Sequence, residues 1–532
     1  MGLTLRKIRE GKLRACSLAA ARPACASLFL VVSLAFASAS LEQIQRLIQK
    51  GDLAGAQNEL NELLKSTPRD PNVWNMRGVV QAQQGNYRAA ESSFQKAIAL
   101  APGFSGAYTN LGHLYQENVK KDPEAVKKGV ATYERLLKFE PGNSEANYQC
   151  AFLLMRLGSF QASLDHLSRV PGEDQDRPQA LAVRCADYGG LKRQPEADAA
   201  AERLLKSPEL QEADVTTILP PLMARHQQAL ALRLLDGLAE RGLTSPNSLL
   251  QLAALYQSAG NLDRARATLE SVAQLQRSVS VPLLLELAHV AYKQGDREGT
   301  LGYLAHARDL DPNNAAVHFF FGIVCAEMNL TEDAYRSLKK ATALNPNNPY
   351  YNYAVGAVIM GRKDVHEAYP YFKKYCQEKP NDPRGRLALG AAYFYGFDLE
   401  LARKELARVA AYPQTTATAF YFLGRIANRQ GNFSEAKSEL LKALQIKPHY
   451  ADAYAELGLL DLKQKEYPAA YEALRKAIEI NPDSYTANLN LMILFQRTYD
   501  PRAEAQAKRF DDISKQRNER QKEFLRTVEV SP

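Results

Sequence analysis

Apolar residues recur at helical intervals along almost the whole chain, and turn-forming residues interrupt them at regular distances. The prolines Pro346, Pro380, Pro448 and Pro482 each follow an Asn or a Lys, and they lie 34 residues apart, or 68 between Pro380 and Pro448. Within each interval, two apolar runs of helical spacing flank a glycine or a short polar turn. Because proline cannot continue a helix, each proline predicts the end of one helical pair and the start of the next.

Small residues occupy fixed places inside these hairpins. In residues 417–450, Gly424 lies in the first half and Ala436 in the second, and residues 451–484 repeat the arrangement with Gly458 and Ala470. We expect the two helices of one hairpin to approach most closely at these residues. A single hairpin of this length cannot cover its own apolar face, so neighbouring hairpins must stack.

The repeated units resemble tetratricopeptide repeats, which carry the pattern W…LG…Y…G.Y…A…F…A…P. Nine units match, and they begin at residues 71, 105, 246, 281, 315, 349, 383, 417 and 451. The resemblance implies an all-α fold, a right-handed superhelical solenoid of helical hairpins whose concave wall is lined by the first helix of each unit. Residues 71–104 carry the pattern as Trp74, Gly78, Gly85, Tyr87, Ala90, Phe94, Ala97 and Pro102.

The quality of the repeat match divides the chain into regions. We expect an N-terminal array at 40–210 and a C-terminal array at 246–500. Between them, 211–245 reads as an irregular helical pair in which Pro220 and Pro221 break or reset a helix, so we expect a bend there. The charged helix and tail at 501–532 predict the polar cap that the end of a solenoid requires.

The first 39 residues differ from the rest of the chain. They carry six basic residues against one acid, then an apolar run from Leu28 to Phe36, then Ala37-Ser38-Ala39. This order predicts a secretory signal peptide cleaved after Ala39. The apolar run is shorter than the roughly 20 residues that span a bilayer, and we expect no transmembrane segment in the mature chain. The predicted location is periplasmic or extracellular, in a bacterium.

The net charge alone favours a nucleic-acid partner, but the distribution of charge along the chain does not. The chain has 67 Lys and Arg against 59 Asp and Glu, a net charge of +8, and such a surplus is typical of nucleic-acid binding. Residues 1–39 and 501–532 hold most of it. The repeat body between them has 53 basic and 52 acidic residues, so we expect no nucleic-acid partner.

Motifs of catalysis and metal binding are missing from the sequence. It contains no phosphate-binding G-x-x-x-x-G-K-[ST], no G-x-S-x-G, no H-E-x-x-H and no C-x-x-C. The eight histidines are scattered and show no metal-ligand spacing. We therefore expect no enzymatic activity, no cofactor and no metal site.

Four of the six cysteines lie beyond the predicted signal peptide. Cys325 falls at a packing position of its unit, which predicts a buried thiol. Cys150 and Cys185 lie 35 residues apart, on corresponding first helices. A disulfide between them would be geometrically demanding, and the bridged and the free form both remain open.

The inner wall of the solenoid is the predicted binding surface. The resemblance implies that positions 2, 5, 9, 12 and 13 of each unit point inward, and in the units at 315, 349, 383 and 417 these positions carry aromatic rings beside guanidinium groups. Tyr and Arg are enriched at binding hot spots, although the same rings could instead fill space between repeats. The predicted partner-binding groove consists of Phe319, Tyr350, Tyr353, Phe394, Tyr395, Tyr421, Arg425, Asn428 and Arg429.

These features predict a non-enzymatic scaffold of the cell envelope that binds a protein or peptide partner in the concave groove at 315–430. The alternative is a scaffold for the export or assembly of a cell-envelope polysaccharide, because stacked aromatic rings also suit sugar rings.

Overall fold

The computed structural model describes residues 39–118, 122, 124–276, 278–362 and 365–515. Regular structure in these ranges consists of thirty α-helices and one short 3-10 helix, with no β-strand. The predicted all-α fold of helical hairpins is confirmed. The predicted signal peptide lies outside the described residues, apart from Ala39, which is the first residue of α1.

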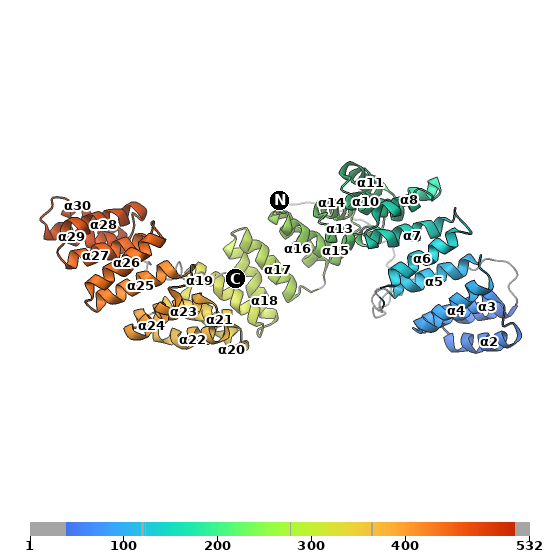
Figure 1. Ribbon diagram of the computed structural model, residues 1–532, viewed down its shortest axis with the longest axis horizontal. Helices are drawn as coiled ribbons and strands as arrows, with labels where there is room; N and C mark the ends of the chain where they lie inside the picture. The colour runs from blue at the N-terminus through green and yellow to red at the C-terminus, as the bar shows by residue number, and fades with distance from the viewer. Residues whose placement is uncertain (1–38, 119–121, 123, 277, 363–364, 516–532) are drawn as a thin grey trace, which may run out of the picture. The chain divides into compact units, whose positions relative to one another are not determined.

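The chain divides into two compact units, with the boundary between Ser248 and Leu249 inside α15. In the first unit, successive helices pair into hairpins, drawn from blue to green in Figure 1. Its helices are α1 (Ala39–Gln49), α2 (Leu53–Ser66), α3 (Pro71–Gln83), α4 (Tyr87–Leu100), α5 (Ser105–Glu117), α6 (Ala125–Leu137), α7 (Ser144–Leu157), α8 (Phe160–Leu167), α9 (Gly172–Gln175), α10 (Pro178–Gly190), α11 (Gln194–Lys206), α12 (Glu212–Thr216), α13 (Leu219–Ala224) and α14 (Gln228–Glu240).

The second unit continues the pairing, drawn from green to red in Figure 1. From α17 on, each first helix packs against the helix that follows it and against the helix that precedes it. The helices are α15 (Pro246–Ser258), α16 (Leu262–Leu275), α17 (Val281–Lys293), α18 (Arg297–Leu310), α19 (Ala315–Glu327), α20 (Thr331–Leu344), α21 (Pro349–Met360), η1 (Val365–Ala368), α22 (Tyr369–Glu378), α23 (Pro383–Tyr395), α24 (Leu399–Val409), α25 (Thr416–Arg429), α26 (Phe433–Ile446), α27 (Ala451–Lys463), α28 (Tyr467–Ile480), α29 (Tyr485–Arg497) and α30 (Ala503–Lys515).

The first helices begin where the repeat pattern predicts, to within one residue for all nine units. Local signals explain this agreement. Asn348 and Asp382 precede α21 and α23, and their side chains accept hydrogen bonds from the backbone N–H groups of Tyr350 and Arg384. Such caps satisfy N–H groups that have no partner inside the helix. Proline follows each cap at a position where its missing N–H costs nothing.

Glycine allows the two helices of a hairpin to touch. A Cβ atom built on Gly424 would lie 2.8 Å from Leu440 Cγ and 3.2 Å from the carbonyl oxygen of Ala436. On Gly458 it would lie 2.5 Å from Leu474 Cγ. These separations are far below van der Waals contact, so a side chain cannot be added without moving the partner helix. The predicted close approach at Gly424 and Ala436 is confirmed.

A pair of glycine substitutions tests this contact. We expect Gly424→Ala to lower the free energy of unfolding by about 1–3 kcal/mol, because the added methyl overpacks the helix interface. Gly302→Ala is the matched control. Gly302 lies inside α18 with nothing within 4 Å of a built Cβ, so there alanine should stabilise by up to about 1 kcal/mol through its higher helix propensity. Urea denaturation would measure both, and equal signs for the two variants would contradict the model of close approach.

The turn between the two helices of a hairpin contains a residue in the left-handed region. Glycine holds this place in several hairpins, as Gly295 and Gly431 show with φ of 82° in both cases. Others carry side chains there, among them Asn329, Phe397 and Tyr499, with φ of 61°, 67° and 56°. This conformation costs an L-residue about 1–2 kcal/mol relative to the right-handed region. Glycine is therefore the residue that best suits the fold at this turn.

Residues 211–245, expected as a helical pair, contain three helices, α12, α13 and α14. Pro220 and Pro221 lie in the first turn of α13, where proline is tolerated. They separate α13 from α12, which ends at Thr216. The prolines thus start a helix here.

Helix α30 packs on α29 at the end of the second unit. Ile513 is buried, and the ring of Phe510 lies 4.9 Å from that of Tyr485 on α29. The side-chain amide of Gln506 donates to the backbone oxygen and the side-chain oxygen of Asn488. The described part of the predicted charged cap, to Lys515, is therefore a helix with one apolar face on the solenoid end.

One buried carboxyl group in the first unit has no hydrogen-bond partner. Asp187 on α10 has no exposed surface, and neither of its carboxyl oxygens is paired. Burial raises its pKa to about 8, and the nearby Ser163 hydroxyl only partly opposes this. That hydroxyl donates to the carbonyl oxygen of Ala151 at 2.8 Å, so its one proton is already used. A protonated Asp187 suits this site, because burying an unpaired carboxylate is costly.

The raised pKa of Asp187 predicts that the folded chain becomes less stable as the pH rises. In the unfolded chain the carboxyl group has a pKa of about 3.9, whereas in the folded chain it is about 8. The folded state therefore holds one more proton between these values, and the free energy of unfolding should decrease with rising pH across that window. Asp187→Asn should remove this part of the pH dependence in denaturation curves recorded from pH about 4 to 9. An unchanged pH slope in the variant would contradict the assignment.

Candidate functional site

The nine residues of the predicted groove differ widely in exposure. Tyr350 is the most accessible ring, with 50% of its surface exposed, whereas Phe394 is completely buried. Arg429 is exposed, and Phe319, Tyr395 and Arg425 are partly buried. The remaining three are buried, namely Tyr353, Tyr421 and Asn428.

Helices α21 and α23 are enclosed on nearly every side, which explains why predicted groove residues are buried. On α21, every residue from Tyr351 to Met360 is buried. Position 6 of these units carries a small side chain, Ala354 or Ala388, so neighbouring first helices pack closely. The ring of Tyr353 lies 5.7 Å from that of Phe372 on α22, inside its own hairpin. Much of the aromatic set therefore fills space between helices.

The buried ring of Phe394 packs against two arginine side chains of the inner surface. Its ring lies under two guanidinium groups, with Arg429 Cζ at 3.9 Å and Arg425 Cζ at 4.6 Å from the ring centroid. Arg429 also donates to the backbone oxygen of Phe394 at 3.1 Å. Stacking of this kind uses the flat face of the guanidinium group. Because Phe394 has no exposed surface, a partner cannot touch it, and we no longer include it in the candidate surface.

A polar network joins the first helices α25 and α27. Asn428 donates to Glu456 at 2.8 Å and accepts from Lys463 at 2.7 Å. Arg425 Nε lies 3.6 Å from the carboxylate of Glu456, and its Nη1 donates to the Tyr395 hydroxyl at 3.4 Å. The predicted residues Tyr395, Arg425 and Asn428 are thus brought together, and Glu456 supplies a counter-charge to Arg425.

Sequence reasoning missed two members of this network, Glu456 and Lys463. The predicted groove was drawn only from the units at 315 to 417, and only from positions 2, 5, 9, 12 and 13 of each unit. Lys463 stands at position 13 of the unit at 451, so extending the reading by one unit would have found it. Glu456 stands at position 6, which the reading left out.

The buried ion pair in this network is open to a direct test. Only 10% of the Glu456 side chain and 18% of the Arg425 side chain are exposed. We expect Arg425→Met to lower the free energy of unfolding by about 2–3 kcal/mol, because it leaves a buried carboxylate without its cation. The double variant Arg425→Met, Glu456→Gln should regain most of this loss, as measured by urea denaturation.

Arg336→Met serves as the control for that comparison. Arg336 is 74% exposed and lies 3.9 Å from Asp333, so its removal should change stability by about 0.5 kcal/mol or less. If Arg425→Met were as mild as Arg336→Met, Arg425 would be available to a ligand at no cost to the fold.

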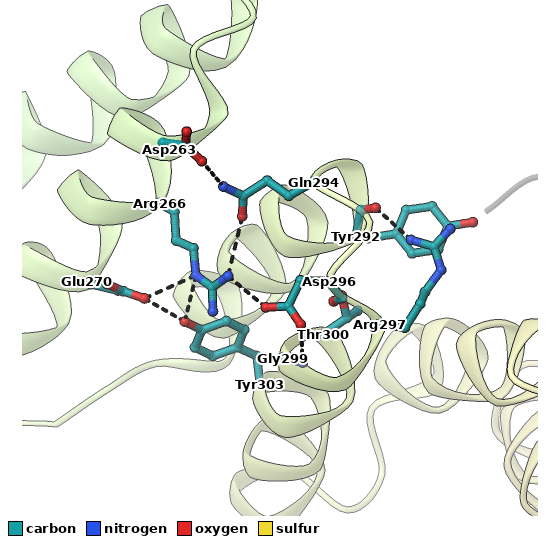
Figure 2. Close-up of polar contacts among 10 residues, drawn as sticks. All are labelled: Asp263, Arg266, Glu270, Tyr292, Gln294, Asp296, Arg297, Gly299, Thr300 and Tyr303. Atoms are coloured by element: carbon teal, nitrogen blue, oxygen red, sulfur yellow. Dashed lines mark hydrogen bonds and ion pairs between the residues drawn. The ribbon is translucent and has the colours of Figure 1, made fainter.

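A second polar network lies between the hairpins α15–α16 and α17–α18 (Figure 2). Arg266 on α16 pairs with Asp296 at 2.7 Å and with Glu270 at 3.2 Å. Gln294, at the end of α17, accepts from Arg266 at 3.4 Å and donates to Asp263 at 2.6 Å. Every charge in this group has an internal partner, so the network fastens one hairpin to the next.

The same arrangement recurs four units later. Arg403 on α24 pairs with Glu435 and donates to Gln430 at 2.7 Å. Gln430 in turn donates to Glu400 at 2.9 Å. Gln294 and Gln430 both stand at position 14 of their units, and Arg266 and Arg403 both stand at position 21. The recurrence identifies an inter-repeat contact, not a ligand site.

A surface depression of about 690 Å³ lies at the loop that joins α22 and α23, and Tyr412 also lines it. Of its two acids, Glu378 and Asp382, Asp382 is unsuited to proton transfer at neutral pH. Burial raises the pKa of Asp382, but hydrogen bonds from Arg384 and Tyr375 outweigh burial and lower it to about 2. The depression therefore offers a fixed carboxylate that is already paired.

Chemistry based on metals or thiols finds no support among the described residues. No three His, Cys, Asp or Glu side chains there could together hold a metal ion. Cys150, Cys185, Cys325 and Cys376 are all free and buried, so Cys150 and Cys185 are not bridged. Burial raises the pKa of both Cys150 and Cys185 to about 12, which keeps them as unreactive thiols. None of the described helices is both long and apolar enough to cross a bilayer.

Comparison with known proteins identifies the repeat. A family model described as tetratricopeptide repeat matches residues 41–103 and 387–451, and a second model with the same description matches 123–184, 291–358 and 427–492. Together these segments make up more than half of the chain. No curated protein matches the chain at a significant level.

Solved structures with similar folds share little sequence with this chain. A tetratricopeptide repeat protein from Parabacteroides merdae ATCC 43184 is 16% identical, with a TM-score of 0.40, over 47% of this chain and 98% of its own. YrrB, a repeat protein with an unusual peptide-binding site, is 23% identical, with a TM-score of 0.28, over 35% and 95%. The Cut9–Hcn1 hetero-tetramer of the APC/C is 13% identical, with a TM-score of 0.36, over 85% and 95%.

Proposed function

Because this chain belongs to the tetratricopeptide repeat family, we propose that it is a non-enzymatic scaffold that binds a protein or peptide partner. The observation that carries the proposal is the stacking of helical hairpins through both units, which leaves the described residues without a separate domain that could hold a catalytic site. Solenoids of this kind offer extended surfaces to other proteins. The binding surface we propose is the accessible part of the predicted groove, formed by Phe319, Tyr350, Tyr395, Arg425 and Arg429.

The exposed aromatic ring of Tyr350 is the best anchor on this surface. It is the second residue of α21 and has half of its surface accessible, although every residue from Tyr351 to Met360 is buried. Lys379 Nζ lies 5.6 Å from its ring centroid, which keeps a positive charge beside an apolar face. Tyrosine combines a large contact area with a polar tip and a small loss of side-chain entropy.

We further infer that the scaffold works in the cell envelope after export. The support is the N-terminal sequence, whose basic, apolar and small-residue segments follow the order of a signal peptide. Cleavage after Ala39 would keep every buried apolar side chain of the described residues, among which Leu41 is the first.

Cross-linking mass spectrometry in the native host tests the function and the export together. We expect cross-links from the Tyr350–Arg429 surface to one protein partner, and a mature N-terminus at Ser40. In Tyr350→Ala, Tyr395→Ala these cross-links should drop about tenfold, the effect of losing roughly 1.4 kcal/mol of binding energy.

Leu401→Ala is the control for the loss of an exposed apolar side chain. Leu401 is 46% exposed on α24, a second helix, so its replacement should leave the cross-links unchanged. Cross-links that persist in the double tyrosine variant would refute the proposed binding surface. An N-terminus at Met1 would refute the proposed export.

A further inference from the structure

The turns inside consecutive hairpins of the second unit lie side by side and form one edge. Arg429 Cζ, at the end of α25, lies 4.9 Å from the ring centroid of Phe397, in the turn after α23. Lys463, at the end of α27, donates to Asn428 on α25 at 2.7 Å. Helix α27 also contacts α29, which ends at Arg497. The term "turn edge" refers below to Phe397, Arg429, Lys463, Lys465, Arg497 and Tyr499.

Two aromatic side chains of the turn edge stand almost entirely in solvent. Phe397 is 74% exposed and Tyr499 is 94% exposed. Both occupy the left-handed turn position, where Gly260, Gly295 and Gly431 stand in other hairpins. Their backbones are strained, and their rings gain little from burial in return. The stability of the folded chain therefore does not account for an aromatic residue at either place.

The four residues between these rings in the turn edge are basic and exposed. Two of the neighbouring acids have partners inside the protein. Asp500 pairs with Arg502 at 2.7 Å, and Asp398 accepts from the Tyr369 hydroxyl at 2.8 Å. Glu466 is the acid beside Lys465. The turn edge thus presents a positive strip that ends in an apolar ring on each side.

We propose that the turn edge binds an acidic segment of a partner protein, with apolar side chains of that segment on Phe397 and Tyr499 and its carboxylates beside Arg429, Lys463, Lys465 and Arg497. The proposal rests on the proposed scaffold function and adds a second contact, which shares only Arg429 with the surface proposed above. A peptide whose carboxylates lie between two apolar side chains matches a strip of cations that ends in a ring on each side.

A peptide fits the turn edge better than a nucleic acid or a membrane does. Those partners present continuous negative charge, and they favour dense basic patches without acids. Here three carboxylates, Asp398, Glu466 and Asp500, follow the turn residues in sequence. They would repel a uniform anion, whereas a peptide can place neutral side chains opposite them.

Binding of labelled peptide pools to the full chain tests the proposal. Three pools share Leu, Phe and Ser and differ in containing Glu, Lys or Gln. We expect the Glu pool to bind best, and more weakly as salt is added, because the cations are exposed. Phe397→Gly, Tyr499→Gly should weaken that binding about tenfold, while the midpoint of thermal unfolding stays equal or rises because glycine relieves the backbone strain.

Asn329→Gly provides the matched control. Asn329 occupies the same turn position in the hairpin α19–α20, with φ of 61°, so the change alters the backbone in the same way without removing a ring. It should leave binding of the Glu pool unchanged. Equal binding of the Glu pool by the wild type and the double glycine variant would overturn the proposed role of the turn edge. The cross-links of Tyr350 would still support the scaffold function in that case. Preference for the Lys pool, or binding to vesicles of anionic phosphatidylglycerol through the same residues, would also overturn it.

Discussion

The contact between a glycine on the first helix and a large side chain on the second governs the geometry of the hairpins. Cβ atoms added to Gly78, Gly356 or Gly390 would lie 2.5–2.8 Å from the facing Phe94, Phe372 or Leu406. Because the large side chain rests directly on the backbone of the first helix, the two helices have one distance and one orientation. A hairpin fixed in this way presents a defined apolar face, and the next hairpin covers it. The stacking of the solenoid follows from this local contact.

Local sequence signals made the helices predictable. The burial of the groove residues depends on neighbouring hairpins, for which a single unit carries no such signal. Prolines, capping residues and the glycine contact all act within a few residues, so the starts of the first helices could be placed from the sequence. Burial around the first helices depends on three successive hairpins at once. Phe394 is buried because Arg425 and Arg429 of the next unit close over it, and a pattern within one unit does not contain that information. For the same reason Glu456 was missed as the partner of Arg425.

One polar contact between hairpins recurs at the same repeat positions as the apolar contacts do. The Arg–Gln–acid group occurs at the same positions around Arg266 and Arg403, and it ties a second helix to the turn of the next hairpin. Basic and acidic side chains thus pair between neighbouring hairpins, which fits a repeat body with 53 basic and 52 acidic residues. Net charge therefore carries little information about partners in a solenoid, and local surplus at an edge carries more.

Tight packing of the first helices limits where a partner can bind. Small residues such as Ala354 and Ala388 bring α21 and α23 into contact with their neighbours on nearly all sides, and the polar groups of α25 and α27 bind one another. The turns escape this constraint because they project from the ends of the helices. At a turn the backbone favours glycine, and a largely exposed aromatic ring there gains little from burial in return. Phe397 and Tyr499 are such residues, and for this reason we propose them as parts of a binding surface.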